Sequence, residues 1–196
     1  ILLNSWEALS FSIDEEKIKE LATNASKLGV ELFVLDDGWF GKRNNDNAGL
    51  GDWNVNKEKF PNGLNEIIEY INKLGMDFGI WIEPEMVNKD SELYRSHPDW
   101  IIHDPNRKPS HTRNQYTLDF SKDEVVDHIY NQIEKLLSDY SISYVKWDMN
   151  RYITECYSKD KGANLQGTVY HKYILNVYKL YDKLTTTSSL EKSNVY

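Results

Sequence analysis

The run Tyr144-Val145-Lys146-Trp147-Asp148-Met149-Asn150-Arg151 decides how this chain folds and where its chemistry lies. Its first half has the pattern of a buried strand, and Asp148 follows where that strand should open into a loop. Because residues two apart share one face of a strand, we expect Lys146, Asp148 and Asn150 to point together. Barrel enzymes built from alternating strands and helices place their reacting groups at the carboxyl ends of strands. The run therefore predicts a catalytic carboxylate at Asp148, with a structural Lys146–Asp148 pair as the alternative.

Strand and helix patterns alternate through the rest of the chain. The capping-box sequence Ser12-Ile13-Asp14-Glu15 opens a helix that ends at Gly29, and Ser121-Lys122-Asp123-Glu124 opens another. We expect apolar strands at residues 2–8, 30–35, 78–82 and 143–147, and helices at 18–28, 64–74, 125–137 and 169–184. Near-continuous apolar strands joined by helices indicate a parallel sheet covered by helices.

This α/β pattern fits either a doubly wound sheet or a (β/α)8 TIM barrel. No G-x-G-x-x-G or P-loop sequence follows a strand, which removes most of the support for nucleotide binding. Long loops follow two strands, at 40–60 and 85–117, as expected where active-site loops gather on one rim of a barrel. The barrel is therefore the favoured architecture.

Only the first four or so β/α units of a barrel can be found, whereas a complete barrel needs about 250 residues. We expect residues 1–184 to be the N-terminal half of a (β/α)8 catalytic domain. Residues 185–196 should form a polar C-terminal tail without fixed structure. Because half a barrel leaves two sheet edges uncovered, we also expect self-association, as in a homo-oligomer, or a partly ordered carboxyl terminus.

Composition restricts the partners and the location of the protein. A net charge of -8 argues against nucleic acid and anionic membranes as partners. No apolar run approaches the roughly 18 residues of a membrane span. The single cysteine, Cys156, excludes an internal disulfide and suits the reducing cytoplasm. The start at Ile1, without an initiator methionine, is typical of an excised segment.

The six tryptophans each lie within two residues of a carboxylate, as Trp81 does with Glu83 and Trp147 with Asp148. Carboxylates accept hydrogen bonds from hydroxyl groups, and indole rings pack on the apolar face of a pyranose, so this composition indicates a sugar site. Alternatively, one or two tryptophans, Trp100 first, are core residues.

Several motifs together carry a family resemblance. They are Asn4-Ser5-Trp6-Glu7-Ala8, Leu35-Asp36-Asp37-Gly38-Trp39-Phe40-Gly41, Gly51-Asp52-Trp53, Gly79-Ile80-Trp81-Ile82-Glu83-Pro84-Glu85-Met86-Val87, His97-Pro98-Asp99-Trp100 and Lys146-Trp147-Asp148-Met149-Asn150-Arg151. In this order, over residues 2 to about 155, the chain resembles the bacterial α-galactosidases (melibiases) of glycoside hydrolase family 36.

The resemblance implies a role for each matching residue. Asp148 is similar to the nucleophile of a retaining glycosidase. Asp36 and Asp37 match the pair that binds galactose hydroxyls, which requires the strand to end there, as Gly38 allows. The remaining candidates for substrate binding are the aromatic walls Trp6 and Trp81, the polar contacts Arg113 and Lys146, which also match charge partners of Asp148, and Asn150. Trp53 is expected to shape the loop around the pocket.

A partner for Asp148 is missing from the sequence. Retaining hydrolysis needs two carboxyl groups about 5–5.5 Å apart, and the family's acid/base aspartate belongs to a later strand that has no counterpart here. Glu155 is a candidate stand-in, but it belongs to the same unit as Asp148. We therefore expect an intact α-galactosidase that cleaves terminal α-1,6-galactosyl groups from melibiose- or raffinose-type sugars without metal or other cofactor. The isolated chain should be nearly inactive.

Three alternatives stay open. The chain can be a non-catalytic galactose-binding fragment, or part of a galactosyl transferase of the raffinose-synthase type. The third alternative is a metal-dependent barrel hydrolase or isomerase, which needs clustered ligands. The five histidines argue against it, because none ends a predicted strand; they are His97, His103, His111, His128 and His171.

Overall fold

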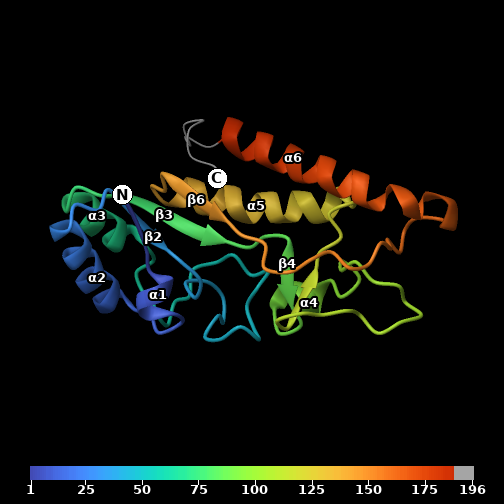
Figure 1. Cartoon of the computed structure of the whole chain (residues 1–196), viewed down its shortest axis with the longest axis horizontal. Helices are drawn as coiled ribbons and strands as arrows, with labels where there is room; N and C mark the ends of the chain where they lie inside the picture. Colours follow the sequence, from blue (N-terminus) through green and yellow to red (C-terminus); the bar gives the residue numbers. More distant parts are fainter. Residues whose placement is uncertain (188–196) are drawn as a thin grey trace.

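The computed structural model describes residues 1–187, and its centre is a parallel four-stranded sheet (Figure 1). The strands are β1 (Leu2–Asn4), β2 (Leu32–Leu35), β3 (Asp77–Ile82) and β6 (Tyr144–Trp147), in the spatial order β1-β2-β3-β6. The expected strands are thus present, and their parallel pairing confirms the α/β class. In register, Leu35 lies opposite Ile80 and Ile82 opposite Trp147, so the carboxyl ends of the strands meet at one edge.

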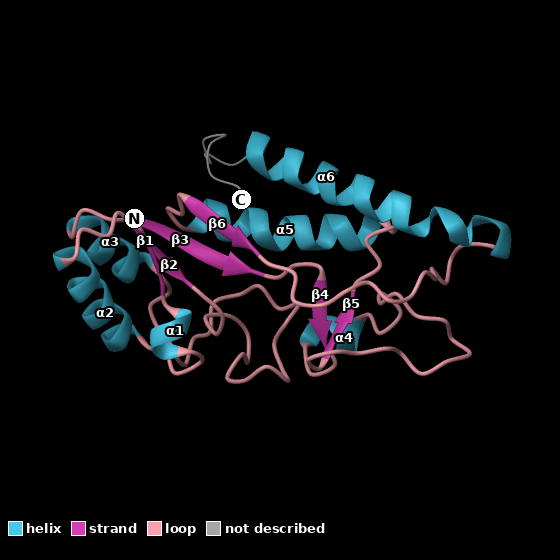
Figure 2. Cartoon of the chain, in the orientation of Figure 1, coloured by secondary structure: helices cyan, strands magenta, loops and turns pink. Residues whose placement is uncertain are grey.

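Helices lie where the apolar spacing predicts them; the first three of these connect the strands, and the last follows β6. These are α2 (Glu15–Lys27), α3 (Asn65–Lys73), α5 (Asp123–Asp139) and α6 (Val169–Thr187). Each of α2, α3 and α5 buries one apolar stripe and keeps charged residues on its other face. In Figure 2, α2 packs beside α3, and α5 beside α6.

The ends of several elements differ from the expectation. The first strand stops at Asn4, and Trp6–Leu9 forms the short helix α1. The side chain that caps α2 is Asp14, which accepts a hydrogen bond from the N–H of Lys17, rather than Ser12. The Ser121 hydroxyl bonds to Asp119, so α5 begins without a side-chain cap.

The segment after β3 contains structure that its polar sequence did not reveal. Two short antiparallel strands, β4 (Met86–Asn88) and β5 (Gln115–Thr117), flank α4 (Glu92–Ser96). Figure 2 shows β4 and β5 beyond the carboxyl end of β3. This second sheet borders the edge where the parallel strands end.

The chain leaves β6 through a loop and the 3-10 turn η1 (Ala163–Thr168) before α6. Within residues 1–187 no strand follows β6, so β1 and β6 are the edges of the sheet. The α6 helix continues to Thr187, past the expected limit at 184, and the rest of the expected tail lies outside the described residues. Over the same range, no helix is both long and apolar enough to cross a membrane.

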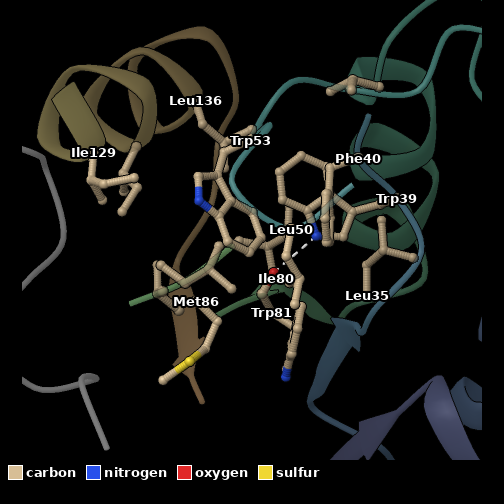
Figure 3. Packing of buried hydrophobic residues seen from close by; sticks show 14 of the residues in the cluster. Leu35, Trp39, Phe40, Leu50, Trp53, Ile80, Trp81, Met86, Ile129 and Leu136 are labelled. Carbon is tan, nitrogen blue, oxygen red and sulfur yellow. Dashed lines mark hydrogen bonds between the residues drawn. The ribbon is translucent and has the colours of Figure 1, made fainter. Parts of the chain in front are cut away.

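Tryptophans fill the core more than the sequence suggested. Trp53 and Trp81 are each 2% exposed, Trp100 is 9% exposed, and Trp39 is fully buried. Figure 3 shows Trp39, Trp53 and Trp81 gathered around Phe40, with the Trp39 indole N–H donating to the carbonyl of Trp81 at 2.9 Å. The prediction that only one or two tryptophans are core residues is therefore wrong. This aromatic cluster is the floor beneath the carboxyl ends of β2 and β3.

The pairing of β3 with β6 yields a stability prediction. Gly79 lies opposite Tyr144, and an added Cβ would stand 2.9 Å from Cδ1 and 3.1 Å from the backbone oxygen of Tyr144. Gly79→Ala should therefore cost about 1–3 kcal/mol of unfolding free energy through overpacking. Gly167→Ala is the control, because a Cβ added at Gly167 would meet nothing within 4 Å. Equal denaturation midpoints for both variants would contradict the tight β3–β6 contact.

Candidate active site

Three residues predicted for the site, together with Asn4, gather where the parallel strands end. Asn4 ends β1, Asp36 follows β2, Trp81 lies near the end of β3, and Asp148 follows β6. Trp81 and Lys146 are register partners on neighbouring strands. The sheet thus brings together residues more than 140 positions apart in the sequence.

The Asp148 carboxylate is held by three hydrogen-bond donors. Its Oδ2 accepts from the indole N–H of Trp81 at 2.9 Å and from the side-chain amide of Asn150 at 2.8 Å. Its Oδ1 accepts from the backbone N–H of Met149 at 2.9 Å. The Asp148 backbone N–H donates to the carbonyl of Ile82, which extends the β6 ladder by one bond. The carboxylate is fixed in direction, with lone pairs of Oδ1 left for a further partner.

Lys146 lies on the same edge but pairs with a different carboxylate. Its Nζ lies 2.9 Å from Oδ2 of Asp36, which also accepts from the side chain of Asn4 at 2.6 Å. The alternative interpretation, a structural Lys146–Asp148 pair, is therefore wrong. The register explains this, since Lys146 sits one strand from β3 and reaches across it toward the end of β2.

Asp36 and Asp37 point to different surroundings. Asp36 faces Asn4 and Lys146, whereas both oxygens of Asp37 accept from the guanidinium of Arg43, at 2.8 and 2.7 Å. Arg43 is itself buried and donates to the carbonyl of Ala48 as well. Burial raises the pKa of the Asp37 carboxyl, and the Arg43 fork opposes that rise. β2 ends at Leu35, and Asp37 and Gly38 lie in a turn in which Gly38 has a φ of +106°, so the strand ends at the aspartates as expected. The two carboxylates nevertheless face different partners.

Glu83 is a buried carboxylate behind Asp148. It is 1% exposed; its Oε1 accepts from the backbone N–H of Asn150 at 2.6 Å, and its Oε2 from the Gln115 side chain at 3.1 Å. Burial raises the pKa of Glu83 from 4.5 to about 7, and the charge of Asp148 adds to the rise. Near pH 7 the Glu83 carboxyl is therefore partly protonated, and so partly neutral.

The other predicted site residues lie around this group. The exposed Arg113 has its Nη1 3.4 Å from Oδ1 of Asn150, and its φ of +56° is unusual for a residue other than glycine. Trp6, half-buried on α1, packs edge-on against Phe11. Trp81 directs its N–H edge at Asp148 while its ring is buried, so it presents no open face within the described residues.

Trp53 belongs to the floor of the site. Its ring packs against Phe40 at 4.5 Å, and Figure 3 shows its nitrogen directed toward the side of α5. Within the described residues this N–H has no hydrogen-bond partner.

The sequence analysis missed three neighbours of the candidate site. Asn4 stands in a motif that carried the resemblance, so that motif was a usable signal. Arg43 and Gln115 lie in polar stretches that gave none. Glu155 accepts from the backbone N–H of Ser110 at 2.7 Å, and no contact in the described part of the chain joins it to Asp148.

The histidines contribute to packing. His97 stacks on Trp100 at 3.8 Å between ring centroids, and His128 meets Trp100 edge-on at 5.3 Å. Among residues 1–187, no group of three or more His, Cys, Asp or Glu side chains is arranged to hold a metal ion. The polar groups at the strand ends therefore consist of carboxylates, one ammonium, amides and indole N–H groups, which suit a polyhydroxylated ligand.

Known proteins are similar to this chain in sequence and in fold. The model of the melibiase family matches residues 1–191. Alpha-galactosidase Mel36A of Lactobacillus acidophilus is 50% identical over 186 residues, which are 95% of this chain and 25% of that protein. The crystal structure of the GH36 α-galactosidase AgaA from Geobacillus stearothermophilus has a TM-score of 0.92 at 50% identity, and the match covers 95% of this chain and 26% of that one.

Ligands are known for some of these structures. Variants of AgaA have been solved in complex with raffinose and with stachyose. TtGalA from Thermus thermophilus, with a TM-score of 0.70 and 26% identity over 92% of this chain and 35% of that one, was solved with p-nitrophenyl α-D-galactopyranoside. The present chain spans about a quarter of the length of the curated relatives that it matches first.

The raised pKa of Glu83 predicts a pH-dependent stability difference. The folded state holds the Glu83 proton up to about pH 7, whereas the unfolded chain loses it near 4.5. As the pH rises from about 4.5 through 7, ionisation of Glu83 therefore lowers the unfolding free energy of the protein by about 3 kcal/mol. Glu83→Gln removes that loss, so its thermal midpoint relative to the parent protein should rise over this range. The exposed Glu20→Gln is the control, and a pH-independent difference for Glu83→Gln would refute the shift.

Proposed function

This chain belongs to the melibiase family, and we propose that the protein containing it is a retaining α-galactosidase. The proposal rests on the identity to Mel36A and AgaA and on the presence of the same fold in AgaA. The ligands of the AgaA variants, raffinose and stachyose, support terminal α-galactosyl groups of melibiose- and raffinose-type sugars as substrates.

The observation that carries the proposal is the fixed Asp148 carboxylate at the end of β6. Two donors on Oδ2 hold it in place and leave Oδ1 with a single bond, to Met149. An oriented carboxylate at a strand end suits nucleophilic attack on an anomeric carbon.

Hydrolysis would proceed in two displacements. In the first, an oxygen of Asp148 bonds to the anomeric carbon while the glycosidic C–O bond breaks, and an acid group protonates the leaving oxygen. In the second, water attacks the same carbon, its proton passes to the group that served as the acid, and the bond to Asp148 breaks. Two inversions retain the configuration of galactose.

The neighbouring polar groups would recognise galactose. Asp36 and Lys146 form a charged pair whose remaining lone pairs and N–H groups suit adjacent hydroxyls. Asp37 would act on hydroxyls only through the lone pairs that its bonds with Arg43 leave free. Asn150 and Arg113 flank Asp148 and are proposed as further polar contacts, with Trp6 and the Trp81 edge as the aromatic boundary.

We place the acid/base residue outside these 196 residues. The four parallel strands and their helices would be the first half of a (β/α)8 barrel, extending over residues 1–184, and a later strand would bring the acid to Asp148. The quarter-length coverage of the relatives is consistent with this division. Completion of the barrel, or a homo-oligomer, would cover the edge strands β1 and β6, and the free thiol of Cys156 suits a cytoplasmic protein.

Replacing the nucleophile tests the mechanism in the full-length protein. Asp148→Gly should lower hydrolysis of an aryl α-galactoside by at least about 10³-fold. Added azide should then restore turnover and give β-galactosyl azide, identified by NMR, because azide enters from the vacated face. Asp127→Asn, which alters a surface ion pair between α5 and α6, should keep full activity. Normal hydrolysis by Asp148→Gly, or an inverted sugar product from the parent, would exclude the proposal.

The isolated chain provides a second test. Residues 1–196 alone should bind galactose weakly and show no turnover above the uncatalysed rate, because the leaving group receives no proton. Turnover comparable to that of the full-length protein would show that a second catalytic carboxyl, such as Glu155, lies within the chain.

A further inference from the structure

The turn that carries Asp148 is held from behind by buried side chains of other elements. After the bond from Asp148 N–H to Ile82, the β3–β6 ladder ends. The next anchor is Glu83, whose Oε1 accepts the N–H of Asn150 at 2.6 Å. The amide of the same Asn150 donates to the Asp148 carboxylate. Glu83 is thus one residue removed from Asp148 along a continuous line of hydrogen bonds.

Gln115 on β5 completes this support. Its side-chain Nε2 donates to Glu83 at 3.1 Å, and its backbone carbonyl accepts a hydrogen bond from the buried Arg151 guanidinium at 2.6 Å. Arg151 also donates to the carbonyl of Ser110 at 3.1 Å. The 150–151 end of the turn is therefore tied to Gln115 on β5, through Glu83 at Asn150 and directly at Arg151, while Asp148 is bonded to Ile82 on β3.

We propose that Glu83 is a positioning residue for Asp148, which it aligns through Asn150 with Gln115 as its own support. The inference rests on the proposed function, because it assigns Glu83 to the nucleophile of that reaction. Glu83 is too buried to touch a sugar, so it acts through the turn alone.

The Glu83 carboxylate supports the turn by accepting one backbone hydrogen bond. Its Oε1 accepts from the N–H of Asn150 at 2.6 Å, and loss of that acceptor would leave a buried N–H without a partner. The turn would then move to satisfy the N–H, and the Asn150 amide would move with it. A displacement of about 1 Å at reacting atoms costs on the order of 10²-fold in rate. We expect a loss of this size in kcat, with little change in galactose binding at Asp36 and Lys146.

Glutamine at position 83 should preserve the function. Its amide oxygen can accept from Asn150, while its NH2 group faces Gln115. The Gln115 Oε1 has no hydrogen-bond partner among the described residues, so a flip of that amide would supply an acceptor. The charge of Glu83, repelled by Asp148 and attracted by Arg43, is therefore not what the turn requires.

Glu85 provides a matched comparison from the same motif. It is 5% exposed and accepts from the hydroxyl of Tyr173 on α6 and from the Trp147 indole at 3.1 Å. Its bonds hold α6 to the sheet and do not reach the 148–151 turn. Loss of Glu85 should therefore affect stability and leave turnover per folded molecule unchanged.

The experiment compares Glu83→Met, Glu83→Gln and Glu85→Met in the full-length protein. We would measure kcat and KM for an aryl α-galactoside, the galactose dissociation constant by calorimetry and the thermal midpoint. Glu83→Met should lose about 10–100-fold in kcat with KM and galactose affinity within about threefold. Glu83→Gln should stay within about threefold of the parent in kcat. Glu85→Met should lower the midpoint while it keeps kcat per folded molecule.

Gln115→Met keeps the test decisive if Glu83→Met does not fold. It removes only the support of Glu83, and it should lower kcat by about 2–10-fold at constant KM. Parent-like kcat in the folded Glu83→Met protein, or in Gln115→Met, would overturn the inference, as would equal losses in Glu83→Gln and Glu83→Met. The proposed function is judged separately, by retention in the parent and by Asp148→Gly. A retaining parent with unaffected Glu83 variants would reject this inference alone.

Discussion

The parallel register of β2, β3 and β6 is the constraint on which this structure depends. It places Leu35 beside Ile80 and Ile82 beside Trp147, so that the residues that follow each strand emerge at one edge. Asp36 and Asp148 are brought to the same edge by backbone pairing, which leaves their side chains free for polar contacts. A slip of one residue in any strand would turn these carboxylates into the helical layer or the core.

The polar groups at this edge form two layers with different duties. The outer layer, with Asp36, Lys146 and Asp148, has lone pairs or N–H groups to spare, and Lys146 and Asp148 are accessible. The inner layer pairs Asp37 with Arg43 and Glu83 with Asn150, and its carboxylates are buried, as is that of Asp36 in the outer layer. Buried carboxylates are costly unless their hydrogen bonds are met, so the inner layer can hold only a few arrangements. Because the inner carboxylates are held in these few arrangements, the outer residues next to them keep their positions above the aromatic cluster.

Local patterns predicted the elements well, and contacts between distant elements poorly. Apolar spacing located α2, α3 and α5, because amphipathic faces follow directly from sequence. The spacing rule also placed Lys146 and Asp148 on one face, but a face has several neighbours, and Asp36 from two strands away was the nearer partner. Tryptophans beside carboxylates in sequence suggested sugar contacts, whereas the Trp81 ring packs against Phe40 and Trp53 and only its N–H edge reaches Asp148. The short strands β4 and β5 had no pattern to reveal them.

Identification of the residue that becomes covalently attached to the sugar would decide whether Asp148 is the nucleophile. The full-length protein would be treated with a fluorinated α-galactoside whose glycosyl-enzyme ester is slow to hydrolyse, then digested and sequenced by mass spectrometry. We expect a single added fluorogalactosyl group on the peptide that contains 144–151, located at Asp148. A label on any other carboxylate, with Asp148 unmodified in fully inactivated protein, would contradict this assignment.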